Sequence, residues 1–169
     1  PFASAVAAAN ALLAGSSAVA LLTAVADGTL RIALADRERS RSVATARQKG
    51  DGFSLDADKT HILDAGIATH FCVPALIKDG ELALFLVPAN ADGLAGSVRK
   101  TPHGTPVGSI RFEALDLPRA ALIAVGKEAE ERLTAMRDSI TAAACAEAVG
   151  LMRSMLEMTV AYAKERKQF

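Results

Sequence analysis

Apolar side chains recur at spacings of three and four from about residue 127 to the end of the chain, which is the spacing of one helical face. The members of this face are Leu133, Met136, Ile140, Ala144, Ala148, Leu151, Met155, Met158 and Tyr162. The pattern predicts one helix that is much longer than a usual globular helix. Such a helix needs neighbours along its whole length, so we expect further helices from a longer chain or from partner subunits.

Between residues 30 and 118 the helical spacing disappears, and short β-type runs alternate with Gly, Asp, Asn and Pro. The predicted strands are residues 31–35, 42–48, 53–57, 60–63, 71–78, 82–88 and 107–113. Asp51-Gly52 and Asp79-Gly80 are turn dipeptides between such runs and predict two hairpins. Strands of this length and spacing favour a small antiparallel β-barrel or sandwich.

Residues 1–29 predict two Ala-rich helices that end near Asp27-Gly28. Gly15 breaks the run, and Ser16 or Ser17 would cap the second helix. Residues 1–26 carry no charge, but the run is rich in Ala and Ser and contains Asn10, so we do not interpret it as a signal or membrane segment. The fold class predicted for the chain is therefore α+β: helices, a β-domain, then a long helix.

Composition narrows the possible partners. Lys plus Arg and Asp plus Glu both number 19, which argues against a nucleic-acid or membrane surface. Hydrophobic residues make up 51% of the chain and aromatic residues only 4%, so alanine-rich helix packing is expected. Cys72 and Cys145 fit no metal-binding spacing. We expect two reduced thiols in a cytoplasmic protein, and no metal site.

Three stretches, in this order of elements, resemble the acyl-CoA dehydrogenase family. Residues 82–89 (LALFLVPA) look like a strand that ends in Val-Pro, and residues 110–118 (IRFEALDLP) look like the last strand of the family's β-domain. Residues 148–151 (AVGL) precede residues 162–169 (YAKERKQF), which match the family's Y-A-x-x-R-x-x-F-G motif up to the Phe. Lys59 also stands where the family has the Lys of a G-x-K sequence.

The resemblance implies three segments of a protein more than twice this length. Residues 1–29 would end an N-terminal helical domain, residues 30–118 would form the middle β-domain, and residues 119–169 would begin a C-terminal four-helix domain. The long helix would then belong to an incomplete four-helix bundle. Its apolar face predicts that this chain by itself aggregates or oligomerises.

The resemblance also implies an oxidoreductase of fatty-acid and lipid metabolism that uses FAD. In this family a carboxylate removes the α-proton of an acyl-CoA thioester and FAD takes the β-hydride. The base is usually a Glu beyond the region matched here, and the alternative position on the long helix aligns with Ile140. Asp138 and Glu147 do not align and are expected to be solvated. We therefore predict no catalytic residue, no activity and no tightly bound flavin for this chain by itself.

The family's flavin loop, T-E-P-G-A-G-S-D, aligns with residues 34–42 (LADRERSRS), which contain neither its glycines nor its proline. Ser40 or Ser42 could stand for the loop serine, while the three arginines are either phosphate ligands or ordinary surface residues. On a second flavin strand, an aromatic residue and a hydroxyl align with His61 and Leu63. His61 could contact a flavin ring, but Leu63 has no hydrogen to donate.

The terminal motif matches better. In the family, its Arg and Phe reach across the dimer interface to the neighbouring subunit's FAD, and the corresponding residues are Arg166 and Phe169. An Arg donates paired hydrogen bonds to a pyrophosphate. The alternative is that Lys164, Arg166 and Lys167 simply complement the negative end of the helix dipole.

Three interpretations follow. The first is part of an acyl-CoA dehydrogenase-like subunit whose own flavin site is degenerate but which completes a partner's site, as occurs in heteromeric members of the family. The second is an ordinary but divergent FAD-dependent acyl-CoA dehydrogenase. The third is a non-catalytic structural or interaction subunit. The first two imply acyl-CoA as substrate and a homo- or hetero-oligomer of related subunits.

Overall fold

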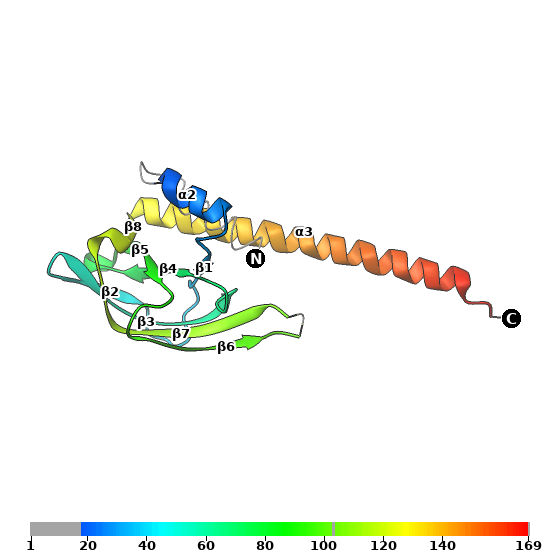
Figure 1. The fold of residues 1–169 in the computed structure, drawn as a ribbon, viewed down its shortest axis with the longest axis horizontal. Helices are drawn as coiled ribbons and strands as arrows, with labels where there is room; N and C mark the ends of the chain where they lie inside the picture. The colour runs from blue at the N-terminus through cyan, green and yellow to red at the C-terminus, as the bar shows by residue number, and fades with distance from the viewer. Residues whose placement is uncertain (1–17, 103, 169) are drawn as a thin grey trace.

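The computed structural model describes residues 18–102 and 104–168 as two helices and a mainly antiparallel β-sheet (Figure 1). In chain order the elements are α2 (Ala18–Ala26), β1 (Ile32–Leu34), β2 (Thr45–Lys49), β3 (Gly52–Leu63), β4 (His70–Leu76), β5 (Leu82–Pro88), β6 (Leu94–Lys100), β7 (Pro106–Leu117), β8 (Leu122–Val125) and α3 (Lys127–Glu165). Two 3₁₀ turns, Lys78–Gly80 and Arg119–Ala121, lie between strands. The predicted α+β class, with a long final helix, is confirmed.

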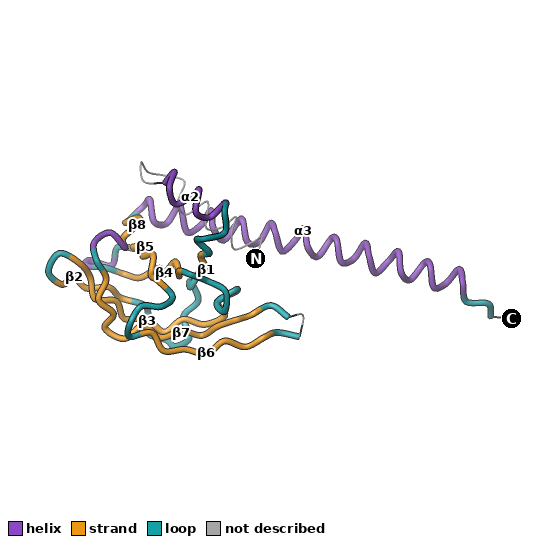
Figure 2. The backbone as a smooth tube through the Cα atoms, in the orientation of Figure 1, coloured by secondary structure: helices purple, strands orange, loops and turns teal. Residues whose placement is uncertain are grey.

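The eight strands form one sheet in the order β6-β7-β3-β2-β4-β5-β8, and β1 pairs with β4 (Figure 2). Both predicted hairpins are present, because β2 pairs antiparallel with β3 and β4 pairs antiparallel with β5. The β1–β4 and β2–β4 pairs are parallel. The loop from residue 35 to residue 44 connects β1 and β2, which lie one after the other along the same side of β4.

The sheet curls so that its two halves face each other across an apolar core, as in a sandwich. Phe53 of β3 packs edge-on against Phe85 of β5, with 5.2 Å between ring centroids. Phe71 of β4 packs in the same way against Phe112 of β7, at 6.3 Å. Since each pair joins strands from opposite halves, these four rings hold the curled sheet closed.

A second apolar cluster lies on the outer face of β1, β4, β5 and β8, beneath the two helices. It contains Leu30, Ile32, Cys72, Leu84, Ala124, Ala129, Leu133 and Met136, with Leu21, Leu22 and Val25 of α2 packed against it. Arg132 adds a polar contact here by donating to the Ile123 carbonyl at 3.1 Å. The first three turns of α3 are therefore held firmly against the sheet.

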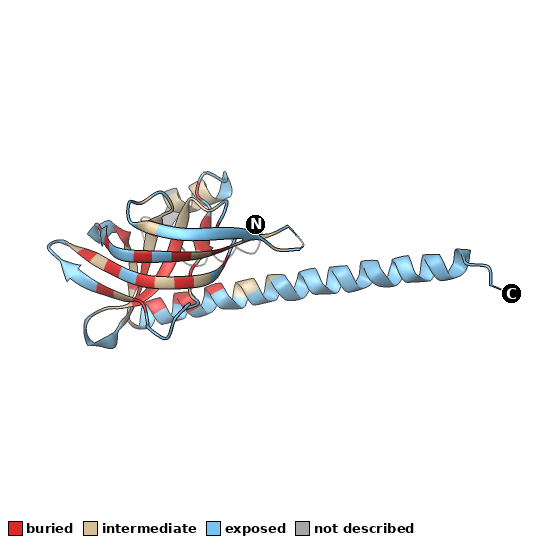
Figure 3. Cartoon of the chain, turned by 90° about the horizontal axis from the view of Figure 1, so that it is seen from below, coloured by how far each residue is buried: buried red, intermediate tan, exposed pale blue. Residues whose placement is uncertain are grey.

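The rest of α3 projects away from the sheet (Figures 1 and 3). Every residue from 144 to 168 is exposed. Large apolar side chains on this stretch are largely open to solvent, namely Val149, Leu151, Met152, Met155, Leu156, Met158 and Tyr162. The predicted face thus divides: Leu133 and Met136 are buried, Ile140 is half-buried, and the members from Ala144 onward are exposed.

Three details differ from the sequence prediction. The separate strands expected at residues 53–57 and 60–63 are one strand, β3, interrupted by irregular pairing with β7. The strands β6 and β8 were not predicted: β6 (LAGSVRK) is almost wholly exposed and lacks an apolar alternation, and β8 has only four residues. The sheet therefore continues beyond residue 118. The first predicted helix, with Gly15, Ser16 and Ser17, lies outside the described residues.

Gly52 offers a test of the β3–β7 contact. A Cβ at this position would lie 2.2 Å from the Leu117 carbonyl oxygen, so a Gly52→Ala change forces backbone to move. We expect it to lower the free energy of unfolding by about 1–3 kcal/mol, measured by chemical denaturation. Gly150→Ala is the control, because no atom lies within 4 Å of its added Cβ and alanine favours the helix. Equal effects of the two changes would contradict this packing.

Candidate functional site

A cavity of about 300 Å³ lies between β1, the end of β3 and α3. Its lining residues are Ile32, Leu34, Asp36, Arg37, His61, Leu63, Met136, Arg137, Ile140 and Thr141. The floor is apolar, and the polar side chains come from the loop after β1, from β3 and from α3. It is the main candidate site because it combines an apolar wall with several hydrogen-bond donors.

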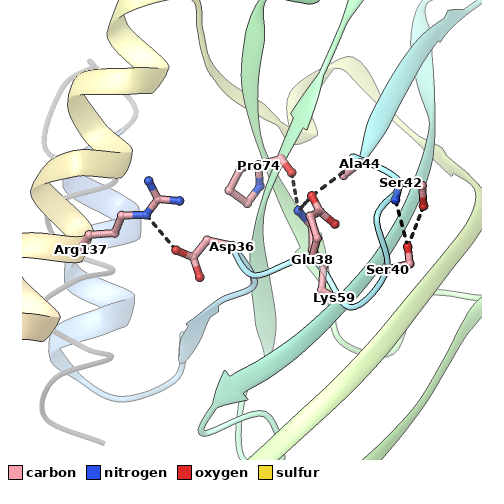
Figure 4. A network of polar contacts seen from close by, with 8 residues as sticks. All are labelled: Asp36, Glu38, Ser40, Ser42, Ala44, Lys59, Pro74 and Arg137. Atoms are coloured by element: carbon pink, nitrogen blue, oxygen red, sulfur yellow. Dashed lines mark hydrogen bonds and ion pairs between the residues drawn. The ribbon is translucent and has the colours of Figure 1, made fainter.

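One ion pair crosses the cavity wall. Arg137 of α3 donates from Nε to Asp36 Oδ2 at 2.8 Å, and Figure 4 shows the two side chains pointing toward each other from helix and loop. Both partners are partly exposed, so the pair is worth little by itself as a source of stability. Its structural effect is to connect the loop after β1 to the middle of the long helix.

His61 reaches the cavity because of a local irregularity in β3. The pairing of β3 with β7 shifts between Lys59 and Ile62, and His61 has a φ of 54°. A bulge of this kind changes the direction in which a side chain points, and His is one of the residues that tolerate a positive φ. His61 therefore lines the main cavity together with Leu63, and its contact with a flavin ring stays a prediction.

An ion pair between a buried lysine and a half-buried glutamate fixes the loop between β1 and β2. Lys59 of β3 is 1% exposed, and its Nζ donates to Glu38 Oε1 at 2.6 Å and to the Pro74 carbonyl at 3.0 Å (Figure 4). The same Glu38 oxygen accepts the Ala44 N–H at 3.1 Å. Burial lowers the pKa of Lys59 from its usual value, while the neighbouring Glu38 acts in the opposite direction.

Ser40 and Ser42 lie away from the main cavity. Their hydroxyl oxygens are 2.7 Å apart and hydrogen-bonded, on the side of the Lys59–Glu38 pair that is remote from Arg137 (Figure 4). Both line a second cavity of about 390 Å³, together with the carboxylates Asp56, Asp58 and Glu113 and the guanidinium of Arg111. Three acids in this lining make it a poor place for a phosphate.

Arg166 stands at the exposed C-terminal end of α3, where its N–H caps the Tyr162 carbonyl at 3.0 Å and its guanidinium lies 5.7 Å from the centre of the Tyr162 ring. Phe169 lies outside the described residues. Ile140 lines the main cavity, whereas Asp138 and Glu147 are exposed, as predicted for them.

The sequence-predicted residues therefore fall in three places: His61 at the main cavity, the two serines at the second cavity, and Arg166 at the helix end. Sequence reasoning missed Asp36 and Arg137 as cavity residues, and it considered Arg37 only as one of the three arginines of the loop. No short motif links them, because Asp36 and Arg137 are 101 positions apart. Lys59 was noticed only through its match to the family, and its burial was not foreseen.

Both cysteines are free; Cys72 is buried and Cys145 is exposed. In the part of the chain that the structure describes, His, Cys, Asp and Glu side chains form no group of three suited to a metal ion. None of the described helices combines the length and the apolar character that crossing a membrane requires.

Known proteins are similar to this chain in sequence and fold, although no protein-family profile matches it. The probable acyl-CoA dehydrogenase FadE25 of Mycobacterium tuberculosis is 26% identical over 148 residues, which are 81% of this chain and 38% of that protein. The ChsE4–ChsE5 complex from the same organism is 26% identical, with a TM-score of 0.79, over 98% of this chain and 45% of the other. A glutaryl-CoA dehydrogenase from Mycobacterium smegmatis in complex with FADH2 shares the fold, at 22% identity with a TM-score of 0.79, over 98% of this chain and 46% of the other.

These matches confirm the resemblance to the acyl-CoA dehydrogenase family that the sequence indicates. The similarity covers only part of those proteins, since the chain spans less than half the length of the FadE25 relative and of the two solved structures just described.

The burial of Lys59 predicts a large effect of Lys59→Met. The change removes the Lys59 donor from the Glu38 carboxylate and from the Pro74 carbonyl, so we expect the free energy of unfolding to fall by about 3 kcal/mol. Lys49→Met is the matched control, because the Lys49–Asp116 pair is similarly short at 2.7 Å but solvent-exposed, and should cost less than about 1 kcal/mol. Chemical denaturation measures both, and equal costs would show that the pair at Lys59 is unimportant.

The cysteines predict a clear difference in reactivity. Apolar surroundings raise the pKa of Cys72 to about 12, so its thiol stays protonated and shielded at neutral pH. We expect the exposed thiol of Cys145 to react quickly with a disulfide reagent, and the buried thiol of Cys72 to react only as the protein unfolds. In a Cys145→Ser variant the fast phase should disappear. A fast reaction of Cys72 in that variant would contradict the packing of α3 over β4.

Proposed function

We propose that this chain forms part of an acyl-CoA dehydrogenase-like flavoprotein subunit, one that removes hydrogen from an acyl-CoA thioester with FAD as the hydride acceptor. We further propose that its own flavin loop is degenerate and that Arg166 and Phe169 serve a neighbouring subunit's FAD. The three segments, residues 1–29, 30–118 and 119–169, would be parts of three domains. The relatives' names and the shared fold support the general activity.

The loop after β1 carries the argument for a degenerate site. A flavin loop needs glycines for close approach and free N–H and hydroxyl groups for the phosphates. Here residues 35–44 contain no glycine, and both carboxylates of the loop already have protein partners. Glu38 is bound to Lys59 and to the Ala44 N–H, and Asp36 is bound to Arg137. These residues do not fit the chain's own FAD.

The end of α3 supports the second part of the proposal. Arg166 makes no ion pair among the described residues and is exposed at the end of the helix, where a neighbouring molecule can reach it. Its guanidinium lies over the Tyr162 ring and beside the side-chain amide of Gln168, which keeps it close to the helix end. FAD would accept the hydride, and this chain would supply a planar cation that binds the pyrophosphate.

The test uses the full-length protein, co-expressed with candidate acyl-CoA dehydrogenase-like partner subunits. We expect fewer than one FAD per subunit, measured as the ratio of flavin absorbance to protein. Arg166→Gln should weaken FAD binding by the complex roughly tenfold to a hundredfold, because a charge-assisted hydrogen bond is lost.

Lys164→Gln is the control, since it removes a neighbouring exposed cation from the same last turn. Equal losses from the two changes would support the helix-dipole explanation of the basic cluster. A homomer with one FAD per chain would show an ordinary, divergent dehydrogenase. A complex that stays colourless with every partner would show a structural subunit.

A further inference from the structure

The main cavity has an apolar floor and a cationic rim. Ile32 and Met136 are buried, Leu34 and Ile140 are half-buried, and Leu63 is 43% exposed, so one aliphatic surface remains open to a ligand. Covering such a surface with an alkyl chain removes apolar area from water. The cavity therefore fits a ligand with an aliphatic body.

The rim has a net positive charge: Arg37 and Arg137 contribute two charges, and Asp36 subtracts one. Arg137 uses only its Nε toward Asp36, so its two terminal nitrogens make no hydrogen bond or ion pair with the described residues. Arg37 is exposed and makes no ion pair in the described part of the chain. A planar carboxylate matches the guanidinium geometry, and the Thr141 hydroxyl, whose hydrogen is donated to the Arg137 carbonyl, lies on the same wall.

The size of the cavity restricts the ligand further. About 300 Å³ is at the lower end of the range for ligand sites, which suits a chain of a few carbons better than a dinucleotide. We propose that this cavity binds a small aliphatic monocarboxylate, with its carboxylate at Arg37 and Arg137 and its alkyl chain on the floor formed by Leu63, Met136 and Ile140. This inference rests on the proposed function in one respect, namely that no flavin of this chain fills the cavity.

The probes are hexanoate, hexanol and hexylamine, which share an alkyl chain and differ in charge. Titration of the protein, followed by NMR of its methyl groups, should show hexanoate shifting the signals of Leu63, Met136 and Ile140 with a Kd of about 1 mM or below. Hexanol should bind at least about tenfold more weakly, since it lacks the charge-assisted bonds, and hexylamine more weakly still.

Arg37→Gln should weaken hexanoate binding at least about fivefold and leave hexanol unchanged. Arg39→Gln is the matched control: Arg39 is an exposed arginine of the same loop that does not line the cavity. Because both side chains are exposed, neither change should affect the fold, and the thermal unfolding midpoint checks this.

Three results would overturn the inference: absence of hexanoate binding, equal affinity for hexanoate and hexanol, or FMN binding that hexanoate displaces. The last result would show that the cavity is a flavin site, and so would also contradict the degenerate loop. The proposed role of Arg166 is tested separately at the other end of α3, so failure at the cavity by itself leaves that proposal standing.

Discussion

The buried ammonium group of Lys59 is the constraint on which the arrangement around the cavity depends. A charge in the interior of a sheet must find compensation nearby, and among the described residues it is Glu38 of the β1–β2 loop that pairs with this ammonium group. The loop is thereby folded down onto β3 and β4. Its earlier residue Asp36 then faces α3, and its later serines face the opposite side. One electrostatic requirement thus decides which of the loop's side chains reach each cavity.

This arrangement also explains why the loop is a poor cradle for phosphates. A cradle keeps its donors unsatisfied until the ligand arrives, whereas this loop brings in two carboxylates, Asp36 and Glu38, that are bound by Arg137 and Lys59. One exception is the second oxygen of Glu38, which is buried without a partner among the described residues. That oxygen adds negative potential to the site and so opposes an anionic group placed beside it.

Much of the fold could be predicted from local patterns, and most of the site could not. The hairpins at Asp51 and Asp79 and the start of α3 near Lys127 follow from turn chemistry and spacing, which are local. The continuity of β3 through His61 depends on pairing with β7, which lies more than forty positions away in the sequence. The contact of Asp36 with Arg137 depends on how α3 crosses the sheet, and no short stretch of sequence encodes that. The domain boundaries and the roles of Arg166 and Phe169 stay predictions.

The exposed length of α3 has a mechanical consequence. At 1.5 Å per residue, the stretch from residue 141 to residue 165 is a rod of roughly 37 Å. Among the described residues, the side chains that hold the helix to the rest of the fold lie at its base, at Ala129, Arg132, Leu133, Met136 and Arg137. A tilt of about 5° at that base moves the far end by roughly 3 Å, more than a hydrogen bond tolerates. Small movements at the base of the helix are thus amplified at its C-terminal end. The position of that end is then determined by whatever packs along residues 141–165.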